Sequence, residues 1–299
     1  ARITPGGTVA AAALFDSPSP QSGGVVVKAA GGPERLASLQ EVPGLPGVRI
    51  NREWQNGIAV GLNGRGDVAT GTRLLNQSAQ PIGSAVVVAS RESIQIVAKT
   101  GDPKPGRPGE TFSLGELERT SVRLSGSGTV AFVEQSNQGV FVGTSIADLR
   151  LAFDPASNVW PAVLGTPSVS PGTLGMNVSD QLVAALTFQG SGATAIAGWD
   201  PVGGSVLLAY TGQTIEIEPG IFRTIAELSI NGHAADVGHR PWSSGGGEDG
   251  APNAIDSAGR VVFTARFTNN EYAVLVATVP SPGAAALWFL ALATVRRRR

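Results

Sequence analysis

Two histidines and one aspartate are spaced as metal ligands can be. His233, Asp236 and His239 occur in the segment HAADVGH, each separated from the next by two residues. Imidazole and carboxylate groups ligate divalent metals, so a loop that folded back would bring the three around one ion. In a glycine-rich loop such residues are more often solvated polar side chains. We keep the three as a candidate metal site, and we expect neither a metal nor another cofactor.

Other patterns that could carry chemistry are weaker. Residues 245–250, GGGEDG, match G-x-G-x-x-G, but no strand precedes them, no helix follows, and their acids would repel a phosphate. No Gly-x-Ser-x-Gly segment is present, and with two histidines a serine hydrolase has little support. Paired carboxylates that cleave glycosidic bonds follow no spacing rule, so a carbohydrate-active enzyme stays open. Tryptophans 54, 160 and 242 lie in polar or proline-rich segments and could stack on sugars, although packing roles are more common.

The composition excludes several classes of protein. The chain has 299 residues, 40 glycines, 20 prolines and no cysteine, so it has no disulfide, thiolate metal site or cysteine nucleophile. The net charge is −1, and four of the 22 basic residues are the terminal arginines, so the body is mildly acidic. A nucleic-acid partner would need a basic face, and we therefore expect none.

An internal repeat underlies the body of the chain. Four segments share a pattern of Asn, Ser or Asp, then Gly or Asp three residues later, then an apolar run. An Asn, Asp or Ser side chain starts a turn by accepting hydrogen bonds from the backbone just ahead, and the later Gly supplies a positive φ. The turn positions are Asn63, Gly66, Ser125, Gly128, Asn177, Asp180, Asp256 and Gly259.

The segments between these turns predict an all-β fold. Each turn is followed by a β-rich run, a Gly/Asn/Ser loop and a second run, which is typical of a hairpin. Further runs bring the count to four strands per repeat, and the turns recur every 52 to 79 residues. This pattern favours a β-propeller of about five blades, with a β-sandwich or a β-solenoid as the alternatives. One short surface helix is expected at 33–41, where a proline opens the segment PERLASLQE.

The repeat suggests two domains: a β-repeat domain over residues 1–278 and a separate segment over 279–299. The first repeat has only its last two strands, which indicates that an N-terminal piece, which could include a signal peptide, precedes it.

The last twenty-one residues, VPSPGAAALWFLALATVRRRR, differ from the body. Twelve of them, Ala284–Val295, carry no charge and favour a short helix of about 18 Å, less than the hydrocarbon thickness of a bilayer. Arginines at its end could snorkel and would mark the cytoplasmic side. The apolar positions are Ala284, Leu287, Trp288, Phe289, Leu290, Leu292 and Val295, followed by Arg296, Arg297, Arg298 and Arg299.

This tail resembles the PEP-CTERM sorting signal of exported Gram-negative bacterial proteins. The motif positions are Val279, Pro280, Ser281 and Pro282, with serine where the commonest form has glutamate. The body is similar to tandem Asn-x-x-Gly-x-x-Ala/Val-Phe repeat proteins of bacterial surfaces, which have no assigned activity. The resemblance implies export, a transient anchor in the inner membrane, and processing by an exosortase-type enzyme.

From these features we expect an exported surface or extracellular-matrix protein with a non-enzymatic role. Its partner would be an extracellular polysaccharide or a surface protein. The alternative is a secreted carbohydrate-active enzyme with its site at the propeller channel.

Overall fold

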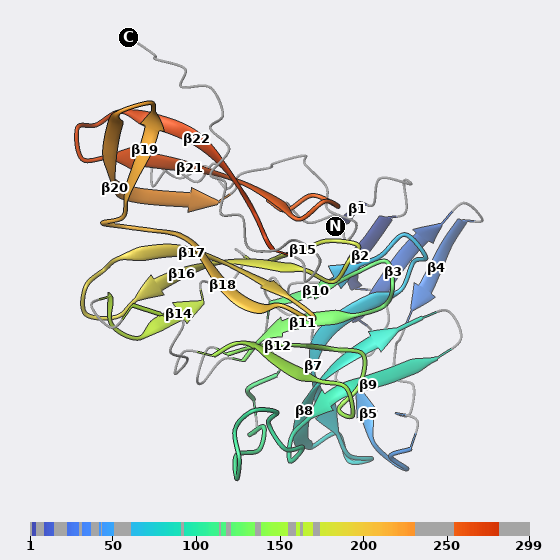
Figure 1. The fold of residues 1–299 in the computed structure, drawn as a ribbon. Coiled ribbons are helices and arrows are strands. Elements are labelled where there is room, and N and C mark those ends of the chain that lie inside the picture. The colour runs from blue at the N-terminus through green and yellow to red at the C-terminus, as the bar shows by residue number, and fades with distance from the viewer. Residues whose placement is uncertain are drawn as a thin grey trace. The chain divides into compact units, whose positions relative to one another are not determined.

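The computed structural model describes nearly all of the chain between residues 42 and 280 (Figure 1). The described residues are 42, 44–50, 61–90, 93–113, 115–117, 121–134, 139–154, 160–161, 164–169, 174–230 and 254–280, together with the backbone of the strands within 2–36. In this part every strand pairing is antiparallel, and the sheets contain four or five strands each, in chain order. The prediction of an all-β fold with sheets of about four strands is confirmed.

The chain divides into two compact units, which we describe separately. The first unit comprises residues 1–151 and 246–251. It contains three sheets, β1–β4, β5–β9 and β10–β13. Their strands are β1 (Arg2–Ile3), β2 (Val9–Leu14), β3 (Gly23–Ala29), β4 (Gly32–Leu36), β5 (Arg49–Ile50), β6 (Gly61–Leu62), β7 (Val68–Leu75), β8 (Pro81–Ala89), β9 (Ile94–Lys99), β10 (Val122–Leu124), β11 (Val130–Val133), β12 (Val140–Gly143) and β13 (Arg150–Phe153).

The second unit comprises residues 152–245 and 252–299 and contains two described sheets, β14–β18 and β19–β22. Its strands are β14 (Pro167–Val169), β15 (Gly175–Met176), β16 (Leu182–Phe188), β17 (Thr194–Asp200), β18 (Gly204–Tyr210), β19 (Thr214–Glu218), β20 (Ile221–Ile230), β21 (Arg260–Phe267) and β22 (Tyr272–Thr278).

Sheets β5–β9 and β10–β13 of the first unit have the same arrangement as sheets β14–β18 and β19–β22 of the second. In each, two very short strands share one edge of a long strand: β5 and β6 pair with β7, and β14 and β15 pair with β16. The Ser84 amide donates to Thr100 Oγ1, and the Ser84 carbonyl accepts the Thr100 amide. Thr194 and Thr211 make the same two bonds. The structural repeat is therefore two sheets long, whereas the sequence pattern predicts a repeat of one.

Aromatic side chains fill the core of the first unit. Phe112, Phe132 and Phe141 are each at most 1 % exposed, and their ring centroids lie 5.1 to 6.1 Å apart. Such pairs contribute about 0.5–1.5 kcal/mol each beyond the burial of their area. They pack with Val86 and Val97, so this core joins sheet β5–β9 to sheet β10–β13.

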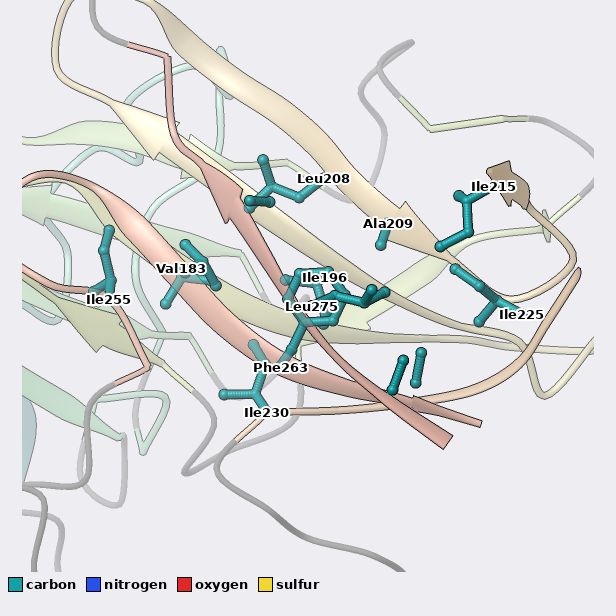
Figure 2. Close-up of a cluster of buried hydrophobic side chains, with 14 of the residues drawn as sticks. Val183, Ile196, Leu208, Ala209, Ile215, Ile225, Ile230, Ile255, Phe263 and Leu275 are labelled. Atoms are coloured by element: carbon teal, nitrogen blue, oxygen red, sulfur yellow. The ribbon is translucent and has the colours of Figure 1, made fainter. Parts of the chain in front are cut away.

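Aliphatic side chains fill the core of the second unit. Figure 2 shows Ile196 of β17 and Leu208 of β18 converging with Phe263 of β21 and Leu275 of β22. Strands β21 and β22 alternate buried and exposed residues, as a sheet with one covered face requires. Val279, which follows β22, belongs to the same core.

Of the two helices that the sequence predicts, one is contradicted in part by the fold and the other lies outside the described residues. The helix expected at 33–41 is wrong over 33–36, where the backbone forms β4 and pairs with β3, so strand pairing overrides the local helix signal. Its remaining residues and the C-terminal helix at 284–295 lie outside the described residues.

Candidate functional site

A proline- and glycine-rich loop after β9 carries a buried cation, Lys104. The loop closes through an isolated bridge between Pro103 and Thr111, and the Lys104 amide donates to the Glu110 carbonyl at 3.0 Å. The Arg107 amide donates to the Lys104 carbonyl at 3.2 Å, which forms a turn inside the loop. These backbone bonds direct Lys104 and Arg107 toward the aromatic core.

Lys104, Arg107, Glu116 and Glu134 form what we term the charge cluster. Lys104 Nζ donates to Glu134 Oε1 and, at 3.3 Å, to Glu116 Oε1, while Arg107 Nη1 donates to Glu134 Oε2 at 2.8 Å. The side chains of Lys104 and Glu134 are 4 % and 0 % exposed. Lys104 Nζ also lies 5.7 Å from the centroid of the Phe112 ring, within cation–π range.

The chemistry of the charge cluster favours a structural role. Its two cations and two carboxylates neutralise one another, and each carboxylate binds a cation of the loop. Glu116 also accepts the Ser113 amide at 2.6 Å, which fixes its own turn. The cluster therefore ties the loop to the residue that follows β11. The sequence pattern missed it, because Glu134 lies 30 residues beyond Lys104 and nothing local marks the pairing.

The four repeat turns share one set of hydrogen bonds. In each, the backbone amide of the first residue donates to the carbonyl of the residue four positions on, and its own carbonyl accepts the amide three positions on. Its side-chain oxygen accepts the amide four positions on, as in Asn63 to Asp67 and Ser125 to Thr129. The third residue after it has a positive φ: Gly66 86°, Gly128 96°, Asp180 61° and Gly259 76°.

Within each unit the first turn also binds the second. Asn63 Nδ2 donates to the Ser125 carbonyl at 3.4 Å in the first unit, and Asn177 Nδ2 donates to the Asp256 carbonyl at 2.9 Å in the second. Both asparagines are buried. The side-chain amide thus connects two sheets, a role that the turn pattern does not reveal.

A second buried polar network extends from Asn177. Asn177 Nδ2 also donates to Gln181 Oε1, and Gln181 Nε2 donates to Asp200 Oδ2 at 3.0 Å. Asp200 Oδ1 accepts the amides of Val202 and Gly203, which closes the turn between β17 and β18. These polar groups therefore hold turns together inside the second unit.

The Arg65-Gly66-Asp67 tripeptide is part of the turn hydrogen bonding. Arg65 Nε contacts Asp67 Oδ2 at 3.0 Å, and the same carboxylate oxygen accepts Asn63 Nδ2. The charged side chains of the tripeptide therefore contact each other within their own turn.

Two surface carboxyl groups are held ionised by local hydrogen bonds. Burial raises the pKa of Asp148, but donors from Thr144 and Ser145 outweigh it and lower that pKa below the ordinary 3.8. Asp256 behaves alike: burial raises its pKa, and hydrogen bonds from Arg260 and Ala258 lower it overall. Both carboxylates cap turns.

Most other candidates from the sequence lie outside the described residues. These are the histidine segment 233–239, tryptophans 54 and 242, and the tail from Ser281 onward. Trp160 is described: it is buried, and its Nε1 donates to the Asp154 carbonyl at 2.7 Å, so it anchors a loop. Val279 is 1 % exposed, and its amide donates to the Gly259 carbonyl at 2.8 Å, which places it in the β domain.

Neither a membrane-spanning helix nor a metal-binding group emerges from the residues that the structure describes. No helix among them is long and apolar enough to cross a bilayer. No group of three or more His, Asp or Glu side chains in that same part is arranged to hold an ion.

Comparison with protein families gives a match for the chain. The model of a family of unknown function (DUF7453) matches residues 2–286, nearly the whole chain. No curated protein matches the sequence.

Proposed function

Because this chain belongs to the DUF7453 family of unknown function, we propose its role from its own residues: an exported bacterial surface or extracellular-matrix protein without enzymatic activity. Its C-terminal segment acts as a PEP-CTERM-like sorting signal, anchors the protein in the inner membrane, and is the substrate of an exosortase-type enzyme. The body then binds an extracellular polysaccharide or another surface protein.

One observation carries the non-enzymatic part of this proposal. Three buried charged groups hold loops and turns: Lys104 with Glu134 in the first unit, and Asp200 with Gln181 and two backbone amides in the second. Catalytic carboxylates need to face a reacting group, whereas these face their own partners.

We propose further that the sheets are blades of a propeller of about five blades. Two features support this arrangement: consecutive four- or five-stranded meanders, and face-to-face packing of neighbouring sheets within each unit.

Cell fractionation tests the sorting proposal. We expect the full chain in the inner-membrane fraction of a Gram-negative host that lacks an exosortase, and a variant without residues 281–299 in the periplasm. The deletion starts after Pro280 because Val279 is part of the core. A variant with Arg296 to Arg299 replaced by glutamine serves as the matched control, since it keeps the apolar run. The same fractionation for the full chain and the deletion variant would contradict the sorting role.

A further inference from the structure

Lys104 and Glu134 meet at a point in the first unit from which water is excluded. Their side chains are 4 % and 0 % exposed, and Lys104 Nζ donates to Glu134 Oε1. The buried ring of Phe112 lies 5.7 Å from the same Nζ. An amine and a carboxyl group held in contact are the two reactants of an amide bond. Because two charges are costly to keep away from water, an uncharged product is favoured there.

Glu116 lies where a proton carrier for this reaction is needed. Its Oε1 is 3.3 Å from Lys104 Nζ, and its Oε2 accepts the Ser113 amide at 2.6 Å, so the backbone holds the carboxylate beside the amine. Its side chain is 9 % exposed. A carboxylate within hydrogen-bond reach of a nucleophile accepts its proton and then returns the proton to the leaving group.

Arg107 contacts the other carboxylate oxygen of Glu134. Its Nη1 donates to Oε2 at 2.8 Å, whereas Lys104 contacts Oε1, so the two oxygens have different surroundings. The guanidinium carbon lies 5.9 Å from the centroid of the Phe141 ring, which holds it against the core. Attack on the carboxyl carbon puts negative charge on the oxygen that stays, and a guanidinium group in contact with that oxygen stabilises the charge.

We propose that Lys104 and Glu134 join in an intramolecular isopeptide bond. Lys104 Nζ attacks Cδ of Glu134, so the Nζ–Cδ bond forms and the Cδ–Oε1 bond breaks. Of the three protons on the ammonium group, one stays on the amide nitrogen and two leave with Oε1 as water, carried by Glu116. Arg107 stabilises the oxyanion on Oε2. No other reactant is consumed, and the reaction happens once per chain, so it is not an enzymatic turnover.

The bond gives a chain without cysteine a covalent crosslink. It ties the loop after β9 to the residue that follows β11, across 30 positions of sequence. A crosslink between distant positions stabilises a fold by restricting the unfolded chain. The hydrogen-bonded charge cluster is the arrangement before the bond forms. The inference goes beyond the proposed function and depends neither on the sorting signal nor on the propeller.

Mass spectrometry of the purified, denatured full chain tests the bond. We expect a mass lower than the sequence requires by one water, about 18 Da. Trypsin should release peptides 100–119 and 124–150 joined to each other, because the first contains Lys104 and the second Glu134. Proline follows both Lys104 and Arg107 and keeps trypsin from cutting the first peptide. The full sequence mass, or a loss of water within peptide 100–119 alone, would overturn the proposal.

Two variants test the role of Glu116. Glu116→Gln keeps the size of the side chain but cannot accept the proton, so the crosslinked fraction should fall at least about tenfold after equal times. Glu110→Gln is the matched control, since Glu110 lies 3.9 Å from Lys104 Nζ with a side chain 49 % exposed, and it should crosslink like the wild type. Circular dichroism establishes that both variants fold. Equal crosslinked fractions would overturn the role of Glu116, and the wild-type mass decides the bond itself even if a variant does not fold.

Discussion

Asn177 Nδ2 donates a hydrogen bond of 2.9 Å to the carbonyl of Asp256, 79 residues further along the chain. Asn63 and Ser125 make the same contact in the first unit over 62 residues. The asparagine Oδ1 closes its own turn while the Nδ2 reaches the next turn, so one side chain links local and long-range structure.

Replacing the donor should therefore destabilise the second unit. Asn177→Asp keeps the turn-closing oxygen but puts a carboxylate oxygen against the carbonyl of Asp256 and against Gln181 Oε1. We expect a loss of about 2–4 kcal/mol in the free energy of unfolding, measured by urea denaturation. Asn76→Asp is the matched control, because Asn76 accepts a backbone amide in the same way at the surface. Equal losses in the two variants would show that the contact with Asp256 contributes nothing.

Replacing the repeat-turn glycine by alanine should cost more stability at Gly259 in the second unit than at Gly128 in the first. A Cβ at Gly259 would lie 2.6 Å from the buried Gln181 Oε1, whereas a Cβ at Gly128 would lie 2.8 Å from the exposed guanidinium of Arg65. Both have a positive φ, so alanine costs about 1 kcal/mol at either position. Gly259→Ala should cost about 1–3 kcal/mol more, because Gln181 is held by Asn177 and Asp200 while Arg65 can move away. Thermal unfolding of the two variants provides the comparison, and equal melting temperatures would refute it.

Breaking the charge cluster should weaken the first unit. Glu134→Gln removes the carboxylate that binds both Lys104 and Arg107, and we expect a loss of about 3–5 kcal/mol in unfolding free energy. The control is Glu110→Gln, since Glu110 lies 3.9 Å from Lys104 Nζ with a side chain 49 % exposed and should change stability by about 0–1 kcal/mol. Chemical denaturation followed by far-UV circular dichroism measures both. A loss at Glu134 no larger than at Glu110 would argue against the cluster as a structural lock.

Asp148 predicts an acid dependence of stability. Its folded pKa lies below the ordinary 3.8, so its ionised form stabilises the fold above that pH. This contribution is lost as the pH falls through the lowered folded pKa. Between pH 5 and about pH 2 the unfolding midpoint of the wild type should approach that of Asp148→Asn. A constant difference between the two proteins across this range would contradict the prediction.

Two deletions test at which residue the β domain ends. Removing residues 281–299 leaves β22 and its neighbours intact, and the melting temperature should stay close to that of the full chain. Removing residues 279–299 also takes away the side chain of Val279 and its bond to Gly259, at a cost of about 2–4 kcal/mol. Differential scanning calorimetry compares the two truncated chains. Equal stability would place the boundary before Val279.

The sequence predicted those parts of the structure whose interactions are local. Each repeat turn is closed by bonds within five residues, and its Asn, Ser, Asp and Gly positions have the expected geometry. The alternation of buried and exposed side chains along β21 and β22 likewise follows from the two-residue period of a strand. Over 33–36 the predicted helix was wrong, because a strand pairing with β3 outweighed local helix propensity there.

The sequence by itself determined an all-β chain of repeated turns, because turn hydrogen bonds and strand periodicity depend on near neighbours. Only the tertiary structure decided that the repeat is two sheets long, that Lys104 pairs with Glu134, and that Asn177 reaches Asp256. Those contacts join residues 30 to 79 positions apart, and no local pattern specifies which distant backbone group or carboxylate the folded chain will place beside a given side chain.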